Sequence, residues 1–304
     1  MQEKRSNKYE KIEPEKEEQV EETQEVEKDY SKLKKILFIL LIIIIIFLTY
    51  TMAIEPKNFI VKEYKVESSL IPESFHGLKI VQFSDIHYGT TINKKELERI
   101  VKLINKQKPD IIVFTGDLID KNISINDTIQ DEITSSLNKL EATLYKYAIY
   151  GNDDDEKHYK DIMEKSNFKL LKNSSTLLYL DGEIPIEITG FDPIESNPNY
   201  TILTNKIDEV DTTNLYKIIL AHDPDTIDKI SIYNPNLVLT GSTLGGSINI
   251  IKPLFTNNSN HIKDYEKIDG IDLYISNGLG TSGINMRLNN LPSISLYRLY
   301  SINE

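Results

Sequence analysis

Several residues that can bind metal ions follow short apolar runs in this 304-residue chain. Asp85 and His87 follow the first run, Asp117 and Asn152 follow the next two, and His222 follows a fourth. Each residue stands where a strand would give way to a loop, so we expect these side chains to meet in one pocket. Carboxylates can bridge two cations, and paired metal ions about 3.5–4 Å apart hydrolyse phosphate esters. The pattern therefore indicates a metal site suited to phosphate chemistry.

The spacing within each motif supports this interpretation. Asp85 and His87 are two positions apart, and side chains alternate along a strand, so both would point toward the same cation. Asp117 follows Gly116, which allows the backbone to turn sharply. Taken singly, Gly-Asp and Gly-Asn pairs are common turn signals, and a lone histidine at a strand end is more often structural. The ordered set, rather than any one residue, carries the inference.

The segments between these residues predict the elements that position them. An apolar run over 78–84 predicts a buried strand, and apolar residues spaced by three and four predict an amphipathic helix over 94–107. The remaining patterns predict strands over 111–115, 147–150, 177–180, 187–191, 218–221, 237–240, 274–276 and 294–300, and helices over 129–140 and 155–165. Helices and strands interleave first, and strands then follow one another closely. This order predicts a mixed α/β sandwich.

The N-terminal part of the chain has a different composition. Residues 1–35 are charged, rich in glutamate and poor in apolar groups, which predicts disorder or a solvated, fraying helix. Residues 36–54 carry no charge, and as a helix they would span roughly 28 Å, close to a bilayer core. A secretory signal fits less well, because a long acidic region precedes the run and no small-residue cleavage site follows. We therefore expect a cytoplasmic tail over 1–35, a transmembrane helix over 36–54 and a domain over 55–304.

Charge on either side of the apolar run predicts its orientation. Three lysines lie within 32–35, whereas Glu55 follows the run. The positive-inside rule then places the tail in the cytoplasm and the domain outside, although Lys57 and Lys62 reduce the asymmetry. The resulting prediction is a single-pass protein of the cell membrane with an extracytoplasmic C-terminal domain.

Net charge and cysteine content exclude several functions. The formal net charge of −12 argues against nucleic acid as a partner, because phosphate backbones select for basic surfaces. The chain has no cysteine, which excludes disulfides, thiolate zinc sites and cysteine nucleophiles. Any metal ion must therefore be held by His, Asp, Glu, Asn or backbone oxygen. Oligomeric state is not indicated by these features.

The ordered motifs resemble the calcineurin-like metallophosphoesterase family, in particular its membrane-anchored bacterial members. Segments 80–87 and 113–117 match that family closely, and segment 278–283 followed by Arg287 resembles the C-terminal end of that subgroup. The resemblance covers about residues 59–300. It implies a four-layer α/β/β/α sandwich with a dinuclear centre at the sheet ends, preceded here by the one transmembrane helix.

The same resemblance implies roles for individual residues. Asp85 and His87 would hold the first metal ion, Asp117 would bridge, and Asn152 and His222 would hold the second. The implied reaction is hydrolysis of a phosphate ester by a metal-activated water, with Mn, Mg, Fe or Zn as the divalent ion. The implied substrate is a phosphorylated small molecule or a lipid-linked phosphate.

Two loops depart from the family pattern. The family's third loop reads Gly-Asn-His-Asp or Gly-Asn-His-Glu, and here Asp153 replaces the histidine that contacts the phosphoryl oxygens. The fifth loop reads Gly-His-Thr-His-Gly-Gly, and here Ser242 and Leu244 replace both histidines, each a ligand of one metal ion. Losing even an outer-shell partner weakens metal binding ~10–100-fold, and general acid catalysis contributes about 10²–10⁴-fold. The remaining carboxylates would suit Mg²⁺, Mn²⁺ or Ca²⁺ better than zinc.

These departures leave two main hypotheses. The first is a membrane-anchored phosphoesterase with an altered and weakened site, in which Asp153 is the candidate substitute for the lost catalytic histidine. The second is an inactive pseudoenzyme that serves as an extracytoplasmic binding or scaffold domain. An unrelated adhesive module is a third reading, and five motif segments in the right order argue against it. His76, His158 and His261 are expected on the surface.

Overall fold

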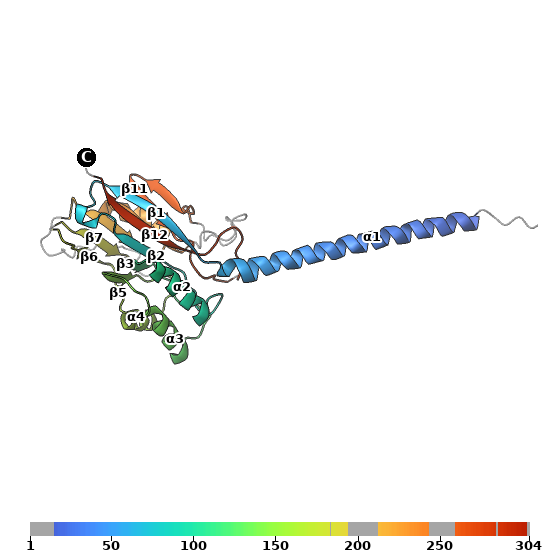
Figure 1. Ribbon diagram of the computed structural model, residues 1–304, viewed down its shortest axis with the longest axis horizontal. Helices are drawn as coiled ribbons and strands as arrows, with labels where there is room; N and C mark the ends of the chain where they lie inside the picture. Colours follow the sequence, from blue (N-terminus) through green and yellow to red (C-terminus); the bar gives the residue numbers. More distant parts are fainter. Residues whose placement is uncertain (1–14, 183, 194–211, 243–258, 284, 303–304) are drawn as a thin grey trace, which may run out of the picture. The chain divides into compact units, whose positions relative to one another are not determined.

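A computed structural model describes residues 15–182, 184–193, 212–242, 259–283 and 285–302. The chain divides into two units, Met1–Tyr50 and Thr51–Glu304. In the first unit, α1 (Glu15–Thr49) is one continuous helix that includes part of the acidic tail and most of the apolar run (Figure 1). The stretch Tyr30–Lys57 contains an 18-residue window with a mean hydropathy of 3.0, and it is long and apolar enough to cross a membrane.

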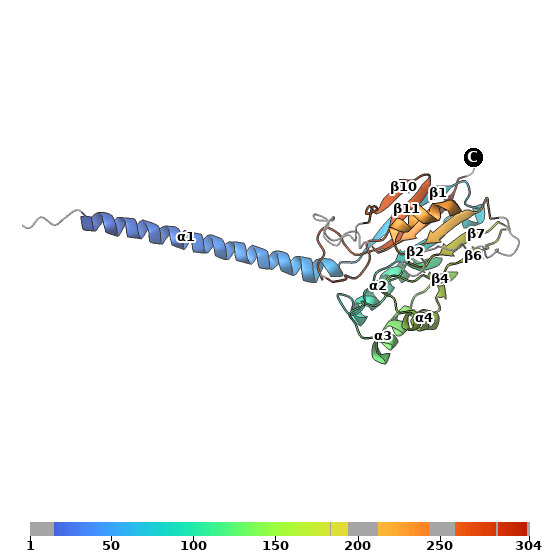
Figure 2. The same cartoon turned by 180° about the vertical axis from the view of Figure 1, so that it is seen from behind.

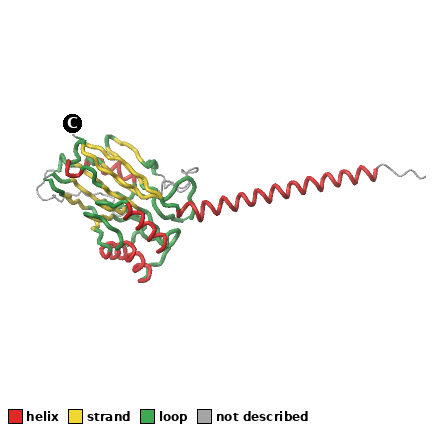
Figure 3. The backbone as a smooth tube through the Cα atoms, viewed as in Figure 1, coloured by secondary structure: helices red, strands yellow, loops and turns green. Residues whose placement is uncertain are grey.

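Within its described residues, the second unit contains two six-stranded sheets (Figure 3). In spatial order, the first sheet consists of β1 (Ile60–Ser68), β12 (Ser293–Ser301), β2 (Lys79–Phe83), β3 (Ile111–Phe114), β4 (Tyr145–Ala148) and β5 (Lys169–Leu170). The second sheet, seen from behind in Figure 2, consists of β10 (Tyr265–Ile268), β11 (Ile271–Ile275), β9 (Leu237–Thr240), β8 (Tyr216–Leu220), β7 (Ile186–Gly190) and β6 (Ser174–Leu178). Strands β2 to β5 are parallel, as are β7, β8, β9 and β11. The carboxyl ends within each parallel set therefore point the same way.

Three apolar clusters define the layers of this unit. The first lies between the first sheet and three helices, α2 (Lys94–Lys106), α3 (Asp127–Leu137) and α4 (Glu156–Lys165). The second lies between the two sheets, and the third joins the second sheet to α5 (Ile227–Ile230). The order helices, sheet, sheet, helix confirms the four-layer α/β/β/α sandwich.

Helix α2 illustrates how local sequence produces these elements. Asn93 caps it, because its side-chain oxygen accepts hydrogen bonds from the backbone N–H groups of Lys95 and Glu96. The apolar face expected from the spacing is fully buried against the first sheet. The helix and strand β2 that precedes it lie close to the ranges expected from the sequence.

Three strands were not expected from the sequence. β1 is an edge strand whose sequence has no long apolar run, and only its Val66 is buried. β5 has only two residues. β10 pairs antiparallel with β11 at the other edge, and none of its residues is buried. Edge strands bury one face at most, so their hydrophobic pattern is weak.

Candidate metal centre

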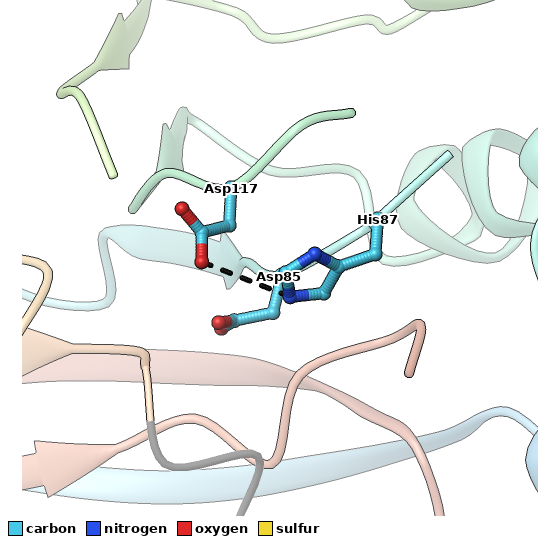
Figure 4. A group of neighbouring side chains, drawn as sticks. All are labelled: Asp85, His87 and Asp117. Carbon is cyan, nitrogen blue, oxygen red and sulfur yellow. Dashed lines mark ion pairs between the residues drawn. The ribbon is translucent and has the colours of Figure 1, made fainter. Parts of the chain in front are cut away.

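The expected metal ligands lie where three strands end. Asp85 and His87 follow β2, Asp117 follows β3, and His222 follows β8 of the other sheet. All four side chains are buried, with exposed fractions between 0 and 6%. Asp85, His87 and Asp117 each place one ligand atom within 4.8 Å of the others (Figure 4). The expectation that these distant segments share one pocket therefore agrees with the geometry.

The backbone brings Asp85 and His87 together in a different way than expected. Strand β2 ends at Phe83, so alternation along a strand does not apply at 85 and 87. Both residues adopt left-handed conformations instead, with φ of 51° and 42°, and Asp117 has a φ of 60°. Asp is one of the few residues besides glycine that tolerates this region, and its cost persists only where the surroundings enforce it.

His222 completes the group from the second sheet. Its Nε2 atom lies 3.2 Å from Asp117 Oδ2, and its Nδ1 lies 2.6 Å from the carbonyl oxygen of Thr115. Nδ1–H donating to a carbonyl leaves Nε2 as the atom that faces the centre, which is how metal-binding histidines are usually oriented. His87 Nε2 is also near the same carboxylate, 3.7 Å from Asp117 Oδ2.

Charges in the group perturb one another strongly. Burial raises the pKa of Asp117, but the positive charges of His222 and His87 outweigh it and hold this pKa below its usual value. Burial lowers the pKa of His222, but Asp117 and Asp85 outweigh it and raise this pKa to about 10. Burial and the Asp117 charge together raise the pKa of Asp85. A protonated His222 thus balances the carboxylates when no cation does.

Asp154 holds the third loop against the second. Its carboxylate accepts hydrogen bonds from the backbone N–H groups of Asp117 (2.9 Å), Leu118 (2.8 Å) and Gly151 (2.7 Å). The backbone N–H of Asp153 donates to Asp117 Oδ1 at 2.9 Å. These bonds fix the position of Asp117, and they were not expected from the sequence.

Two residues that replace family histidines lie at the centre. Asp153 Oδ2 is 3.8 Å from His87 Nδ1, so a carboxylate stands beside one of the expected ligands. The backbone N–H of Ser242 donates to the carboxylate of Asp85, at 3.1 and 3.3 Å from its two oxygens. Leu244 lies outside the described residues.

Asn152 differs from the other expected ligands. It is exposed and lines a small hollow of about 160 Å³ together with Lys172 and Asp192. Its role as a ligand stays a prediction. His158 lies on α4 beside Asp155, with 2.6 Å between Nδ1 and Oδ1, as expected for a solvated helix face.

Sequence reasoning missed Asp120, which is buried beside the centre. Its Oδ2 atom lies 3.9 Å from His87 Nδ1, an atom with no hydrogen-bond partner in the described part of the chain. The signal was present, because Asp120 follows Asp117 by three positions in the same loop. Asp120 and Asp153 also line a pocket of about 400 Å³ whose apolar wall includes Ile123 and Ile125.

Comparison with known proteins decides the family. A family model described as calcineurin-like phosphoesterase matches residues 78–278, which contain all the expected ligands. The chain belongs to this family. Members of the family are metal-dependent and hydrolyse phosphate esters, and the expected metallophosphoesterase resemblance is confirmed.

Relatives of this metallophosphoesterase include bacterial and vertebrate proteins. An uncharacterized metallophosphoesterase of Bacillus subtilis, YkuE, is 33% identical over 84% of this chain and 90% of its own length. A Danio rerio transmembrane protein with a metallophosphoesterase domain is 28% identical over 78% of this chain, which spans only 56% of that relative. The Chlamydia muridarum UDP-2,3-diacylglucosamine pyrophosphatase LpxG is 26% identical over 69% of this chain and 81% of its own length.

The donor set of the centre fits a divalent cation. Asp85 and Asp117 supply carboxylate oxygens, which suit Mg²⁺ and Mn²⁺, and His87 and His222 supply imidazoles, which suit Mn²⁺, Fe²⁺ and Zn²⁺. Packing these buried carboxylates together without a compensating positive charge would be unfavourable.

Proposed function

We propose that this protein is a membrane-anchored metallophosphoesterase whose metal site is altered and weakened. The supporting observation is the buried group of Asp85, His87 and Asp117, with one ligand atom of each within 4.8 Å of the others. The proposal of a weakened site rests on Ser242 and Asp153, which replace family histidines at this centre.

Each residue of the centre has a proposed role. Asp85 and His87 would hold one divalent ion, His222 and Asn152 would hold a second, and Asp117 would serve both. When bound, such ions stabilise negative charge on phosphoryl oxygens and lower the pKa of a water. Asp153 faces the 400 Å³ pocket and orients the leaving group there. Thr115 keeps the His222 ring in its orientation, and Asp154 keeps Asp117 in place.

The location and the substrate class are proposed from the apolar helix, the pocket beside the centre and the names of two relatives. The apolar helix and the name of the Danio rerio relative support a membrane anchor, and the lysines at 32–35 support a cytoplasmic tail with the domain outside. The pocket beside the centre would take the organic part of a phosphorylated small molecule or lipid-linked phosphate. The name of LpxG, a pyrophosphatase of a diacylated sugar nucleotide, is consistent with the second class.

The test uses the full chain purified in detergent with Mn²⁺ and an aryl phosphate. Elemental analysis should find bound divalent metal, and the wild type should hydrolyse the ester faster than Asp117→Ala. Equal rates for wild type and Asp117→Ala would refute the enzymatic proposal. An Asn93→Ala variant, altered at the cap of α2 and not at a proposed ligand, controls for general loss of stability.

A second candidate function is a pseudoenzyme that binds or scaffolds without turnover. It is supported by Ser242, whose backbone N–H donates to the carboxylate of Asp85. Restoring histidine through Asp153→His, Ser242→His and Leu244→His distinguishes the two functions. Activity that appears only in the restored chain supports the pseudoenzyme, whereas substantial activity in the wild type excludes it.

A further inference from the structure

The residues that follow α1 are packed inside the second unit. Thr51, Glu55 and Pro56 are buried, and Glu55 is only 1% exposed. The carbonyl oxygen of Thr51 accepts a hydrogen bond from the backbone N–H of Arg287 at 3.0 Å. Glu55 Oε1 accepts one from the backbone N–H of Asn290 at 2.9 Å. The segment is therefore part of the domain rather than a free linker.

Arg287, whose backbone N–H bonds to this segment, carries a fully buried guanidinium group. One of its NH groups donates to the carbonyl oxygens of Asn277 (3.0 Å) and Asn290 (3.2 Å), and the other donates to the carbonyl oxygen of Gly280 (2.6 Å). Burial lowers the pKa of Arg287 to about 10, and the charges of Asp85 and Glu55 oppose this shift. The guanidinium thus lies within the electrostatic reach of both carboxylates.

Both charged groups are incompletely satisfied. Glu55 Oε2 and Arg287 Nε are buried without a hydrogen-bond partner in the described residues. Two opposite charges buried near each other are a weak source of stability, because desolvation offsets most of their attraction. Retaining both charges in a closed interior therefore points to a role beyond packing.

The loop that Arg287 holds lies directly against the metal ligands. The backbone N–H of Gly280 donates to the carbonyl oxygen of Asp85 at 2.7 Å, and that of Leu279 donates to the carbonyl oxygens of Ser84 and Asp85. A Cβ atom at Gly280 would lie 2.0 Å from the carbonyl oxygen of Ile86, so the two loops touch without room for a side chain. These bonds hold Asp85 in its left-handed conformation.

We propose that Glu55 and Arg287 are positioning residues for the metal ligand Asp85. Glu55 fixes the backbone at Asn290 and balances the charge of Arg287, Arg287 fixes Gly280, and Gly280 fixes Asp85. The segment that leaves the apolar helix thereby becomes part of the metal site's support. The effect on metal affinity rests on the proposed function, whereas the effect on the Asp85 loop does not.

Glu96 provides a matched control for Glu55. It is also a buried glutamate with an unpartnered Oε2, and it pairs with Lys57 of the same segment at 3.3 Å. It lies on α2, and none of its bonds in the described residues leads to Asp85. Glu55→Gln and Glu96→Gln therefore make the same chemical change, and only the first should disturb the loop.

Hydrogen–deuterium exchange on the full chain in detergent, without metal, tests the positioning step. We expect Glu55→Gln to accelerate exchange about tenfold in peptides over 84–89 and 278–290, because the buried Arg287 loses a nearby opposite charge. Glu96→Gln should leave these peptides unchanged. Equal exchange in both variants, or acceleration spread over the whole domain, would overturn the proposal. Arg287→Lys, which keeps the charge but loses the fork of donors, should accelerate the same peptides and serves if Glu55→Gln does not fold.

Mn²⁺ titration of the same variants tests the consequence for the site. Glu55→Gln should weaken Mn²⁺ binding about tenfold, as loss of an outer-shell partner does, while Glu96→Gln at a similar Tm should not. Equal Mn²⁺ affinity in the two variants contradicts the positioning role in metal binding. If the wild type binds no Mn²⁺, the proposed function fails. The exchange experiment still shows whether Glu55 and Arg287 position the Asp85 loop.

Discussion

Replacing Gly151 by alanine would place a methyl group against the most central carboxylate. A Cβ atom at this position would lie 2.2 Å from Asp117 Oδ1 and 2.4 Å from the backbone nitrogen of Asp117. Gly151 does not have a positive φ, so alanine causes no backbone strain there. The perturbation is therefore purely steric and acts on one metal ligand.

Its magnitude follows from how tightly the two loops are joined. Gly151 N and Asp117 N both donate to Asp154 Oδ2, at 2.7 and 2.9 Å, so the backbones cannot separate without losing a bond. The carboxylate must move by about 1 Å to reach normal contact, and a displacement of that size at a reacting group can lower a rate about 10²-fold. Overpacking of this kind destabilises a fold by about 1–3 kcal/mol, or roughly 2–4 °C in Tm per kcal/mol at this size.

The assay is Mn²⁺ titration and aryl phosphate turnover of Gly151→Ala beside Gly182→Ala. Among the described residues, a Cβ at Gly182 meets only the side chain of Ser74, with Oγ 3.2 Å and Cβ 3.5 Å away, and that hydroxyl can rotate. We expect Gly151→Ala to lose metal affinity and activity while Gly182→Ala retains both. A Gly151→Ala protein that binds Mn²⁺ as well as the wild type would refute the steric argument and the assignment of Asp117 as a ligand.

Three further perturbations have defined outcomes. The pKa of His222 is raised to about 10 from 6.5, so in EDTA its contribution to the free energy of unfolding is complete below about pH 6.5 and is lost as pH rises toward 10. Thermal melts of His222→Gln should lack this decline in stability. A His222→Gln protein with the same pH profile as the wild type would contradict the ion pair with Asp117. Asp154→Asn leaves at least one of three backbone N–H donors without its acceptor and should lower the free energy of unfolding by about 1–3 kcal/mol in urea melts. Asn93→Ala removes the cap of α2 and should cost ~1 kcal/mol by the same method, with Mn²⁺ affinity unchanged.

Most of the candidate ligands of the centre could be predicted because they lie in short local motifs. Asp85, His87, Asp117 and His222 each follow an apolar run, and long-range folding only had to bring these strand ends together. The interior strands β3 and β9 were predicted to within one residue, since buried parallel strands are continuous apolar runs.

The remainder depended on contacts that no local pattern reveals. Asp154 and Arg287 act through hydrogen bonds to backbone groups of other loops, and Asp120 lies 3.9 Å from the ring of His87. Such partners have no sequence period. The left-handed turns at Asp85 and His87 also could not be predicted, because the alternation rule assumes that the strand continues. Strand β1 was missed because it pairs with β12 through residues that are 233 positions apart in the sequence, and because it has no long apolar run of its own.

One side-chain contact links the two sheets, in a chain that has no cysteine for a disulfide. His222 and the loop after β3 belong to different sheets and lie 107 positions apart in sequence, yet the ring contacts both Thr115 and Asp117. In a chain without cysteine, this bridge is a reversible cross-link between the two halves of the sandwich. A divalent ion shared by the same two residues would tighten it, so chelators and alkaline pH should weaken the contact between the sheets at this point.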